Sequence, residues 1–113
     1  MNSRAKGKRG ELELVHTLNG YGFVTRRGQQ FSGVNGDADV VGIDGLHIEV
    51  KRVEQLNIEK ALEQSRRDAR DGEIPVVIHR KNGEDWKVTL DLEWFVRLWR
   101  VKEGFKDIAK KRL

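Results

Sequence analysis

Residues 37–51, with the sequence DADVVGIDGLHIEVK, decide the fold because they hold two β-rich runs on either side of an Asp-Gly pair. Such a pair is a strong turn signal, so a β-hairpin with its turn at residues 44–45 is predicted. Successive side chains of a strand point to opposite faces, which puts Glu49 and Lys51 on the same face of the second strand. Antiparallel pairing brings Asp39 close to both. We therefore expect three charged side chains to converge at one end of the hairpin.

The same alternation predicts which face of the second strand is buried. Ile48 and Val50 form an apolar side that packs on the core, and the polar side, which includes His47, is expected to face a cleft. The other two histidines are scattered along the chain, and a lone histidine is more often a satisfied surface or core residue than a metal ligand. We therefore leave His47 out of the predicted metal site, although it points toward it.

The three charged residues are the parts that phosphodiester hydrolysis needs. Two neighbouring carboxylates repel each other unless a cation lies between them, so Asp39 and Glu49 predict a cation site. Oxygen ligands favour Mg²⁺, with Mn²⁺ as a substitute, and the absence of cysteine excludes thiolate sites. The Lys51 ammonium can stabilise charge on a phosphate or help to deprotonate a water molecule. An ordinary cross-strand salt bridge explains the same fragment equally simply, and these residues alone leave that alternative open.

The flanking sequence predicts one α/β domain. Apolar residues recur at helical spacing between about residues 4 and 19, and Glu11 lies at the edge of the core-facing side of that helix. A glycine-rich loop is predicted at residues 28–36. The other predicted elements are strands at 22–26, 74–79 and 86–90, a helix from about 58 to 71 and a helix from 92, giving the order αβββαββα. The 113 residues are expected to form a single domain with a basic tail from about residue 102.

Charge and hydropathy narrow the class of partner. Lys and Arg total 22 against 18 Asp and Glu, and the pI of about 9.6 favours a polyanionic partner. Neither a signal peptide nor a stretch long enough to span a bilayer is recognisable, so we expect a soluble, intracellular, cytoplasmic protein with no membrane partner. Basic residues concentrate near both ends and in two pairs, and those expected to hold phosphates are Lys6, Lys8, Arg9, Arg26, Arg27 and Arg66.

Several motifs occur in the order found in one nuclease family. They are Lys6-Gly7, Glu11, Glu13-Leu14, Gly22-Phe23, Arg26, Ser32, Asp39-Val40-Val41, Ile48-Glu49-Val50-Lys51, Ser65-Arg66-Arg67 and Ile74-Pro75-Val76. Over approximately residues 6 to 80, this pattern resembles the archaeal-type Holliday junction resolvases and, more widely, the PD-(D/E)xK nuclease superfamily. The resemblance implies a restriction-endonuclease-like fold, with a mixed central β-sheet flanked by helices. It also implies metal-dependent cleavage of branched DNA, most of all of four-way junctions.

The resemblance assigns roles residue by residue. Glu11, Asp39 and Glu49 are implied to bind or organise the metal, with the Val50 carbonyl as a further ligand, and Lys51 to assist the attacking water. Ser32 corresponds to a loop serine near the scissile phosphate, Gln64 to a polar helix residue beside the site, and Arg26 and Arg27 to contacts with the DNA backbone.

The sequence departs from the family pattern in three places. Ala38 replaces the usual proline before Asp39, which makes Asp37 a rival for the metal role. The loop between Ser32 and Asp39 is longer than usual, so a direct role for Ser32 is left open. Beyond Arg80 no motif matches, and the last strand and helix are predicted from pattern alone.

A homodimer is expected, because a four-way junction is cut on two opposed strands by two sites related by a twofold axis. Phe95, Val96 and Trp99 on the third helix are the candidate interface, and the tryptophans are expected in the core or at that interface. Two alternatives remain: another PD-(D/E)xK nuclease of repair or restriction type, and a basic DNA-binding module without catalysis.

Overall fold

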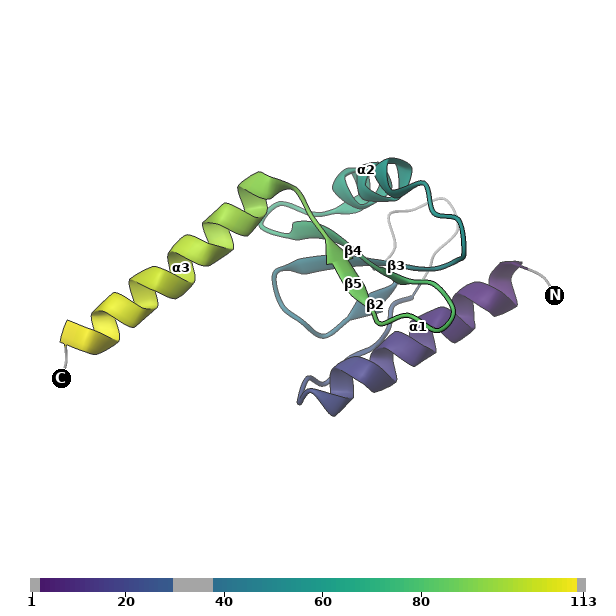
Figure 1. The fold of residues 1–113 in the computed structure, drawn as a ribbon, viewed down its shortest axis with the longest axis horizontal. Helices are drawn as coiled ribbons and strands as arrows, with labels where there is room; N and C mark the ends of the chain where they lie inside the picture. Colours follow the sequence, from purple (N-terminus) through teal and green to yellow (C-terminus); the bar gives the residue numbers. More distant parts are fainter. Residues whose placement is uncertain (1–2, 30–37, 112–113) are drawn as a thin grey trace.

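A mixed five-stranded sheet lies at the centre of the molecule, with strand order β1-β2-β3-β4-β5 (Figure 1). The computed structural model describes residues 3–29 and 38–111, and of these the side chains of 7–29, 38–104 and 106. β3 and β4 are parallel, whereas the other neighbouring strands are antiparallel. The elements are α1 (Ser3–Gly20), β1 (Arg26–Arg27), β2 (Val40–Val41), β3 (Leu46–Arg52), α2 (Ile58–Asp68), β4 (Ile74–Arg80), β5 (Lys87–Thr89) and α3 (Leu92–Lys111). The predicted order αβββαββα is confirmed.

Helices cover both faces of the sheet. α1 packs its buried Leu14 and Val15 on the face that carries Ile48 and Val50, and α2 packs Ala61 and Leu62 against Val77 on the other face. Because α2 covers the face that also carries His47 and Glu49, both residues are buried, with side chains that are only 4% and 6% exposed. The polar face of β3 therefore does not open onto one continuous cleft: Glu49 and Lys51 line one cavity, and His47 lines another.

The hydroxyl of Ser65 fixes α2 to the sheet. It is fully buried, and its Oγ lies 3.1 Å from the carbonyl oxygens of both His47 and Val76, on the two parallel strands. Asn57 caps the start of α2, because its side chain accepts a hydrogen bond from the Lys60 N–H at 3.1 Å. The helix ends at Asp68, earlier than predicted, because Ala69 adopts an extended conformation.

The strand predicted at 22–26 begins only at Arg26 in the structure, because side-chain contacts tie the preceding segment to the end of α1. The Asn19 Oδ1 accepts hydrogen bonds from the Thr25 backbone N–H and hydroxyl, both at 2.8 Å, and β1 begins only afterwards. The same segment crosses close to Gly42, which has a φ of +121°. A Cβ at Gly42 would lie 2.9 Å from the Thr25 Cα and closer still to the Val24 carbonyl oxygen. Only glycine fits this crossing without a shift of the backbone.

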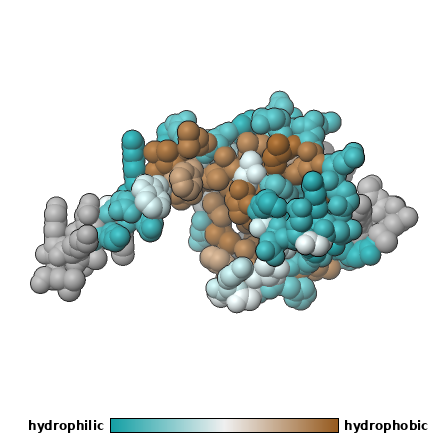
Figure 2. Space-filling model, viewed as in Figure 1, coloured by the Kyte–Doolittle hydropathy of each residue, from teal (hydrophilic) through white to brown (hydrophobic). Residues whose placement is uncertain are grey.

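α3 leaves the domain at its Leu92 end and extends away from the sheet, which gives the molecule a longest dimension of 57 Å (Figure 1). The basic tail predicted from about residue 102 is therefore helical as far as Lys111. Apolar residues cluster where α3 joins the domain (Figure 2). No helix in the described part of the chain has the length and apolar character needed to cross a membrane.

Candidate active site

A cavity of about 340 Å³ lies where α1, the start of β2, the end of β3 and α2 meet. Six residues with predicted site roles line it, although they come from four different elements or their edges. These are Glu11, Asp39, Glu49, Val50, Lys51 and Gln64, and the other lining residues are Gly7, Gly10, Arg52 and Val53. Ser32 and Asp37, the other two residues considered for the site, lie outside the described residues.

Asp39 is fixed by the backbone of β3. Its N–H donates to the Ile48 carbonyl at 3.0 Å, and its Oδ2 accepts a hydrogen bond from the Val50 N–H at 2.9 Å. Burial, followed by the negative charge of Glu49, raises the pKa of Asp39 from 3.8 to about 7, although the Val50 N–H acts in the opposite direction. Glu11 also raises this pKa. The ionised form of Asp39 is therefore disfavoured, first because the side chain is buried and second because other carboxylates crowd it.

A divalent cation fits this donor set. Glu11, Asp39 and Glu49 line one cavity, and the negative charges of Glu11 and Glu49 make Asp39 harder to ionise. A cation bound among the three carboxylates would offset the repulsion between them. All the candidate donors are oxygen atoms, which Mg²⁺ and Mn²⁺ prefer.

Glu11 is held at the cavity by an ion pair. The Arg27 Nε donates to the Glu11 Oε1 at 2.9 Å, and the Glu11 side chain is only 16% exposed. Two residues further along α1, Glu13 forms ion pairs with Arg52 on β3, at 3.2 Å, and with Arg80 on β4. These contacts fix the part of α1 that carries Glu11 over the ends of the two parallel strands.

A second set of possible metal ligands adjoins the cavity. His47, Glu49 and Asp68 each offer one ligand atom, and these atoms all lie within 4.8 Å of one another. The His47 Nε2 is 3.2 Å from the Glu49 Oε1. His47 was left out of the metal site predicted from the sequence, although its place two residues before Glu49 was a signal. Asp68 gave no signal, because its approach to β3 depends on how α2 packs.

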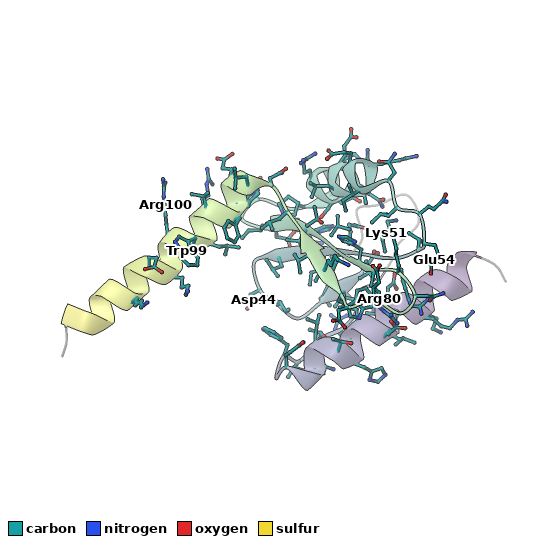
Figure 3. All side chains as sticks on the ribbon, in the orientation of Figure 1. Asp44, Lys51, Glu54, Arg80, Trp99 and Arg100 are labelled. Carbon is teal, nitrogen blue, oxygen red and sulfur yellow. The ribbon has the colours of Figure 1, made fainter. Side chains whose placement is uncertain are left out.

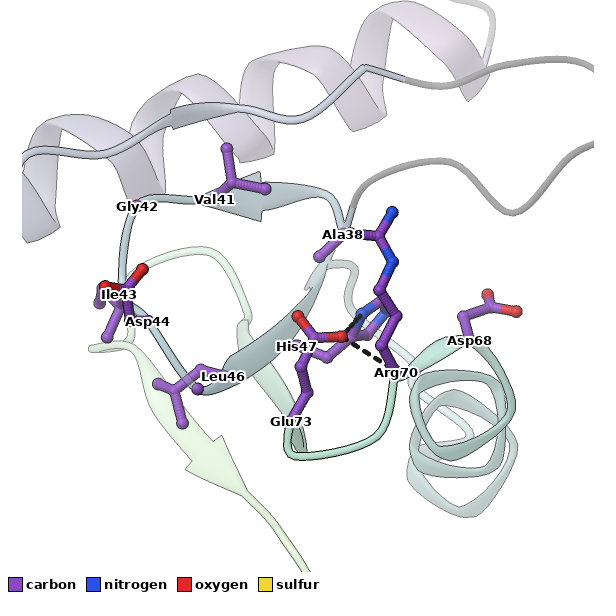
Figure 4. Close-up of a pocket in the computed structure, with 11 residues that line it drawn as sticks. Ala38, Val41, Gly42, Ile43, Asp44, Leu46, His47, Asp68, Arg70 and Glu73 are labelled. Carbon is purple, nitrogen blue, oxygen red and sulfur yellow. Dashed lines mark hydrogen bonds and ion pairs between the residues drawn. The ribbon is translucent and has the colours of Figure 1, made fainter.

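The other ring nitrogen of His47 faces a second, smaller cavity of about 140 Å³ (Figure 4). The Nδ1 lies 3.7 Å from the Glu73 Oε1. Burial lowers the pKa of His47, but the hydrogen bond and charge of Glu49, with the charges of Glu73 and Asp68, outweigh it and raise the pKa above 6.5.

The residues predicted to hold DNA phosphates have different surroundings. Lys8 and Arg9 are exposed on α1, and the side chain of Lys6 lies outside the described part. Arg26 is exposed, but Arg66 forms an ion pair with Asp91, with its Nε at 2.9 Å from Oδ2. Lys51 lies toward the opposite end of the molecule from Trp99 and Arg100 on α3 (Figure 3).

Neither known protein-family profiles nor curated proteins gave a match to this chain. Among solved structures, it is similar to Hjc, a Holliday junction resolvase from the archaeal hyperthermophile Archaeoglobus fulgidus, with a TM-score of 0.52 and 26% sequence identity. The similarity covers 75% of this chain and 72% of the resolvase chain. The resemblance to archaeal-type Holliday junction resolvases is thus found in the structure as well as in the motifs, and the mixed five-stranded sheet flanked by helices is consistent with the restriction-endonuclease-like fold.

Proposed function

We propose that this protein is a Mg²⁺-dependent endodeoxyribonuclease that cuts four-way DNA junctions by hydrolysing phosphodiester bonds. The observation that carries the proposal is the meeting of Glu11, Asp39, Glu49 and Lys51 at one cavity. The similarity of the fold to a Holliday junction resolvase supports the choice of substrate. A DNA-binding module without catalysis gives no reason for three carboxylates and an amine to share a cavity.

Asp39, Glu49 and the Val50 carbonyl are the proposed metal ligands, and Glu11 completes or organises the set. A bound Mg²⁺ or Mn²⁺ supplies Lewis-acid stabilisation of the negative charge that develops on the phosphate. Asp39 is already oriented for this role, because its Oδ2 is fixed by the Val50 N–H. Glu49 is held on the rigid central part of the sheet. Ligands on such elements keep their geometry better than ligands on loops.

Lys51 is the proposed catalytic amine. It follows Glu49 on the same face of β3, lines the same cavity, and among the described side chains forms no ion pair. Its ammonium is therefore free to orient the attacking water and to stabilise the pentacovalent phosphate. Gln64 on α2 contributes a polar group at the cavity wall. Ser32 is proposed, from its place in the family pattern, to approach the scissile phosphate.

Basic residues of α1 and β1 are proposed to hold the DNA backbone. Lys8 and Arg9 are exposed one helical turn or less from Glu11, so they can contact phosphates that flank the cut. Lys6, Arg26, Arg27 and Arg66 complete the proposed contact set, in which Arg27 and Arg66 are each also paired with a carboxylate of the protein. Binding should then weaken with salt, with a log-log slope of about −0.9 for each neutralised phosphate.

The proposed assembly is a homodimer formed through α3. Leu92, Phe95 and Trp99 recur on one side of this helix and are between 49% and 75% exposed, which is a large apolar surface for a small monomer. A second copy of the same helix offers an equally apolar face, and a twofold interface places two active sites as a symmetric junction requires.

The decisive experiment is cleavage of a synthetic four-way junction beside linear duplex DNA of the same sequence, with Mg²⁺ or with EDTA. We expect paired nicks in the junction, little cutting of the duplex and no cutting in EDTA. Glu49→Gln and Lys51→Met should each lower the cleavage rate by about 10² or more. Both variants should still bind the junction in Ca²⁺, which separates lost chemistry from lost binding.

The matched control is Lys81→Met, which removes an exposed lysine that does not line the cavity. Equal cutting of junction and duplex would favour another type of PD-(D/E)xK nuclease. Junction binding without metal-dependent cleavage would favour a non-catalytic DNA-binding module.

A further inference from the structure

We infer that His47 is a positioning residue that holds the Glu49 carboxylate in the orientation needed to bind the metal. This inference rests on the proposed function, because it assumes that Glu49 is a metal ligand. It adds a role for a residue that does not line the cavity and lies behind it.

The contact between the two side chains is short and buried. The His47 Nε2 lies 3.2 Å from the Glu49 Oε1, and the two side chains are only 4% and 6% exposed. A buried carboxylate needs hydrogen-bond donors to stay in one rotamer, and an N–H of His47 supplies one. One oxygen of Glu49 is thereby engaged on the side of α2, so the carboxylate is restricted to one orientation toward the cavity.

His47 is itself held from three sides. Its Nδ1 faces the Glu73 Oε1 at 3.7 Å, and its carbonyl oxygen lies 3.1 Å from the Ser65 Oγ. The β3 backbone on which it lies is paired along its length with β4, with His47 opposite Pro75. The backbone of His47 is thereby fixed, and because its side chain is only 4% exposed with a carboxylate at each ring nitrogen, the ring has little freedom to turn.

The competing explanation is that His47 itself binds the metal. It arises because His47, Glu49 and Asp68 on α2 lie within reach of one cation. Two contacts favour positioning. Each His47 ring nitrogen already faces a carboxylate oxygen, Nε2 that of Glu49 and Nδ1 that of Glu73. In addition, His47 lines the small cavity on the far side of Glu49 and is absent from the residues that line the candidate site.

The test compares two amide substitutions in the full chain. His47→Gln places an amide N–H near the position of Nε2, from which it can donate to Glu49. His47→Asn places its amide near Nδ1, too short to reach Glu49. We expect Mn²⁺ affinity, measured by calorimetry without DNA, to fall about 10- to 100-fold in His47→Asn and to be largely retained in His47→Gln.

Two further measurements complete the test. His79→Gln is the matched control, because this half-buried histidine on β4 contacts the Thr89 hydroxyl, not a carboxylate, and its loss should leave Mn²⁺ affinity unchanged. Electron spin-echo spectroscopy of the Mn²⁺-loaded wild type should show no directly bonded nitrogen. Circular dichroism confirms that each variant is folded.

Unchanged affinity in His47→Asn, or equal losses in both variants, would overturn the positioning role. A nitrogen bonded to Mn²⁺ would show that His47 is a ligand and would also overturn it. If the wild type bound no Mn²⁺ at all, the metal site of the proposed function would fail, and this inference with it. That result differs from a failure of His47 alone, in which wild-type binding is normal.

Discussion

The Arg27 guanidinium lies against the Glu11 carboxylate, with Nε 2.9 Å from Oε1, and so connects β1 to α1 at the edge of the candidate site. Both residues have proposed roles toward other charged groups: Glu11 toward the metal and Arg27 toward DNA. The ion pair couples metal binding to DNA binding, because a cation bound beside Glu11 and a phosphate bound at Arg27 each weaken the pair.

Removal of Arg27 should therefore strengthen metal binding. Without DNA, the guanidinium opposes a second cation near Glu11, so Arg27→Gln should raise Mn²⁺ affinity about threefold to tenfold. Calorimetric titration checks this, with Arg26→Gln as the control, since Arg26 is exposed and its guanidinium, among the described residues, hydrogen-bonds the Arg27 carbonyl and no carboxylate. Weaker Mn²⁺ binding in Arg27→Gln would show instead that the ion pair organises Glu11 for the metal.

The raised pKa of Asp39 predicts how the stability of the metal-free protein depends on pH. The folded state holds the proton up to about pH 7, whereas the unfolded state releases it near 3.8. The stabilisation by this proton is therefore fully present below about pH 4 and is lost as the pH rises to about 7. The loss amounts to at most about 4 kcal/mol, because each pKa unit corresponds to about 1.4 kcal/mol.

Asp39→Asn should remove this dependence. In EDTA, the free energy of unfolding of the variant relative to wild type should rise by a few kcal/mol between pH 5 and pH 8. Urea unfolding across this range is the measurement, and Asp44→Asn, at an exposed position on the same hairpin, is the control. A difference between Asp39→Asn and wild type that stays constant with pH would contradict the prediction.

The close crossing at Gly42 predicts a large difference between two glycines of one hairpin. Gly42→Ala should lower the free energy of unfolding by about 2–4 kcal/mol, because the methyl group would overlap backbone atoms of Val24 and Thr25 at a positive φ. Gly45→Ala should cost only about 1 kcal/mol, because its φ is +86° but the space beside it is open. Equal losses in urea unfolding would mean that the Val24–Thr25 segment moves aside readily.

If the proposed dimer forms through the apolar side of α3, one pair of changes on that side should dissociate it. Phe95 and Trp99 stack, with ring centroids 6.5 Å apart, while each remains about half exposed. Phe95→Asp with Trp99→Asp should therefore yield a folded monomer, because charged residues at the centre of an apolar interface are costly to bury. Sedimentation velocity over a range of concentrations measures this, and Tyr21→Asp, at a 79% exposed aromatic away from α3, should remain dimeric. A monomeric wild type would rule out the proposed assembly.

Much of the fold and part of the site follow from short-range patterns in the sequence. Helical spacing of apolar residues predicted α1 and α2, and the Asp-Gly turn with strand alternation predicted the hairpin that brings Asp39, Glu49 and Lys51 to one cavity. These patterns can be read from the sequence because they arise within a few residues of each other. The boundaries were less predictable: β1 is shortened by Asn19 contacts that no local pattern reveals.

Only the tertiary structure decided how the helices meet the sheet. Three features depend on the packing of elements far apart in sequence. They are the burial of His47 and Glu49 under α2, the approach of Asp68 and Glu73 to His47, and the ion pair between Arg27 and Glu11. The projection of α3 depends equally on how the chain leaves β5. Periodicity within a helix or strand specifies which of its sides is apolar. Which other element covers that side depends on packing across the whole domain, and the contacts of each charged group depend on that packing in turn.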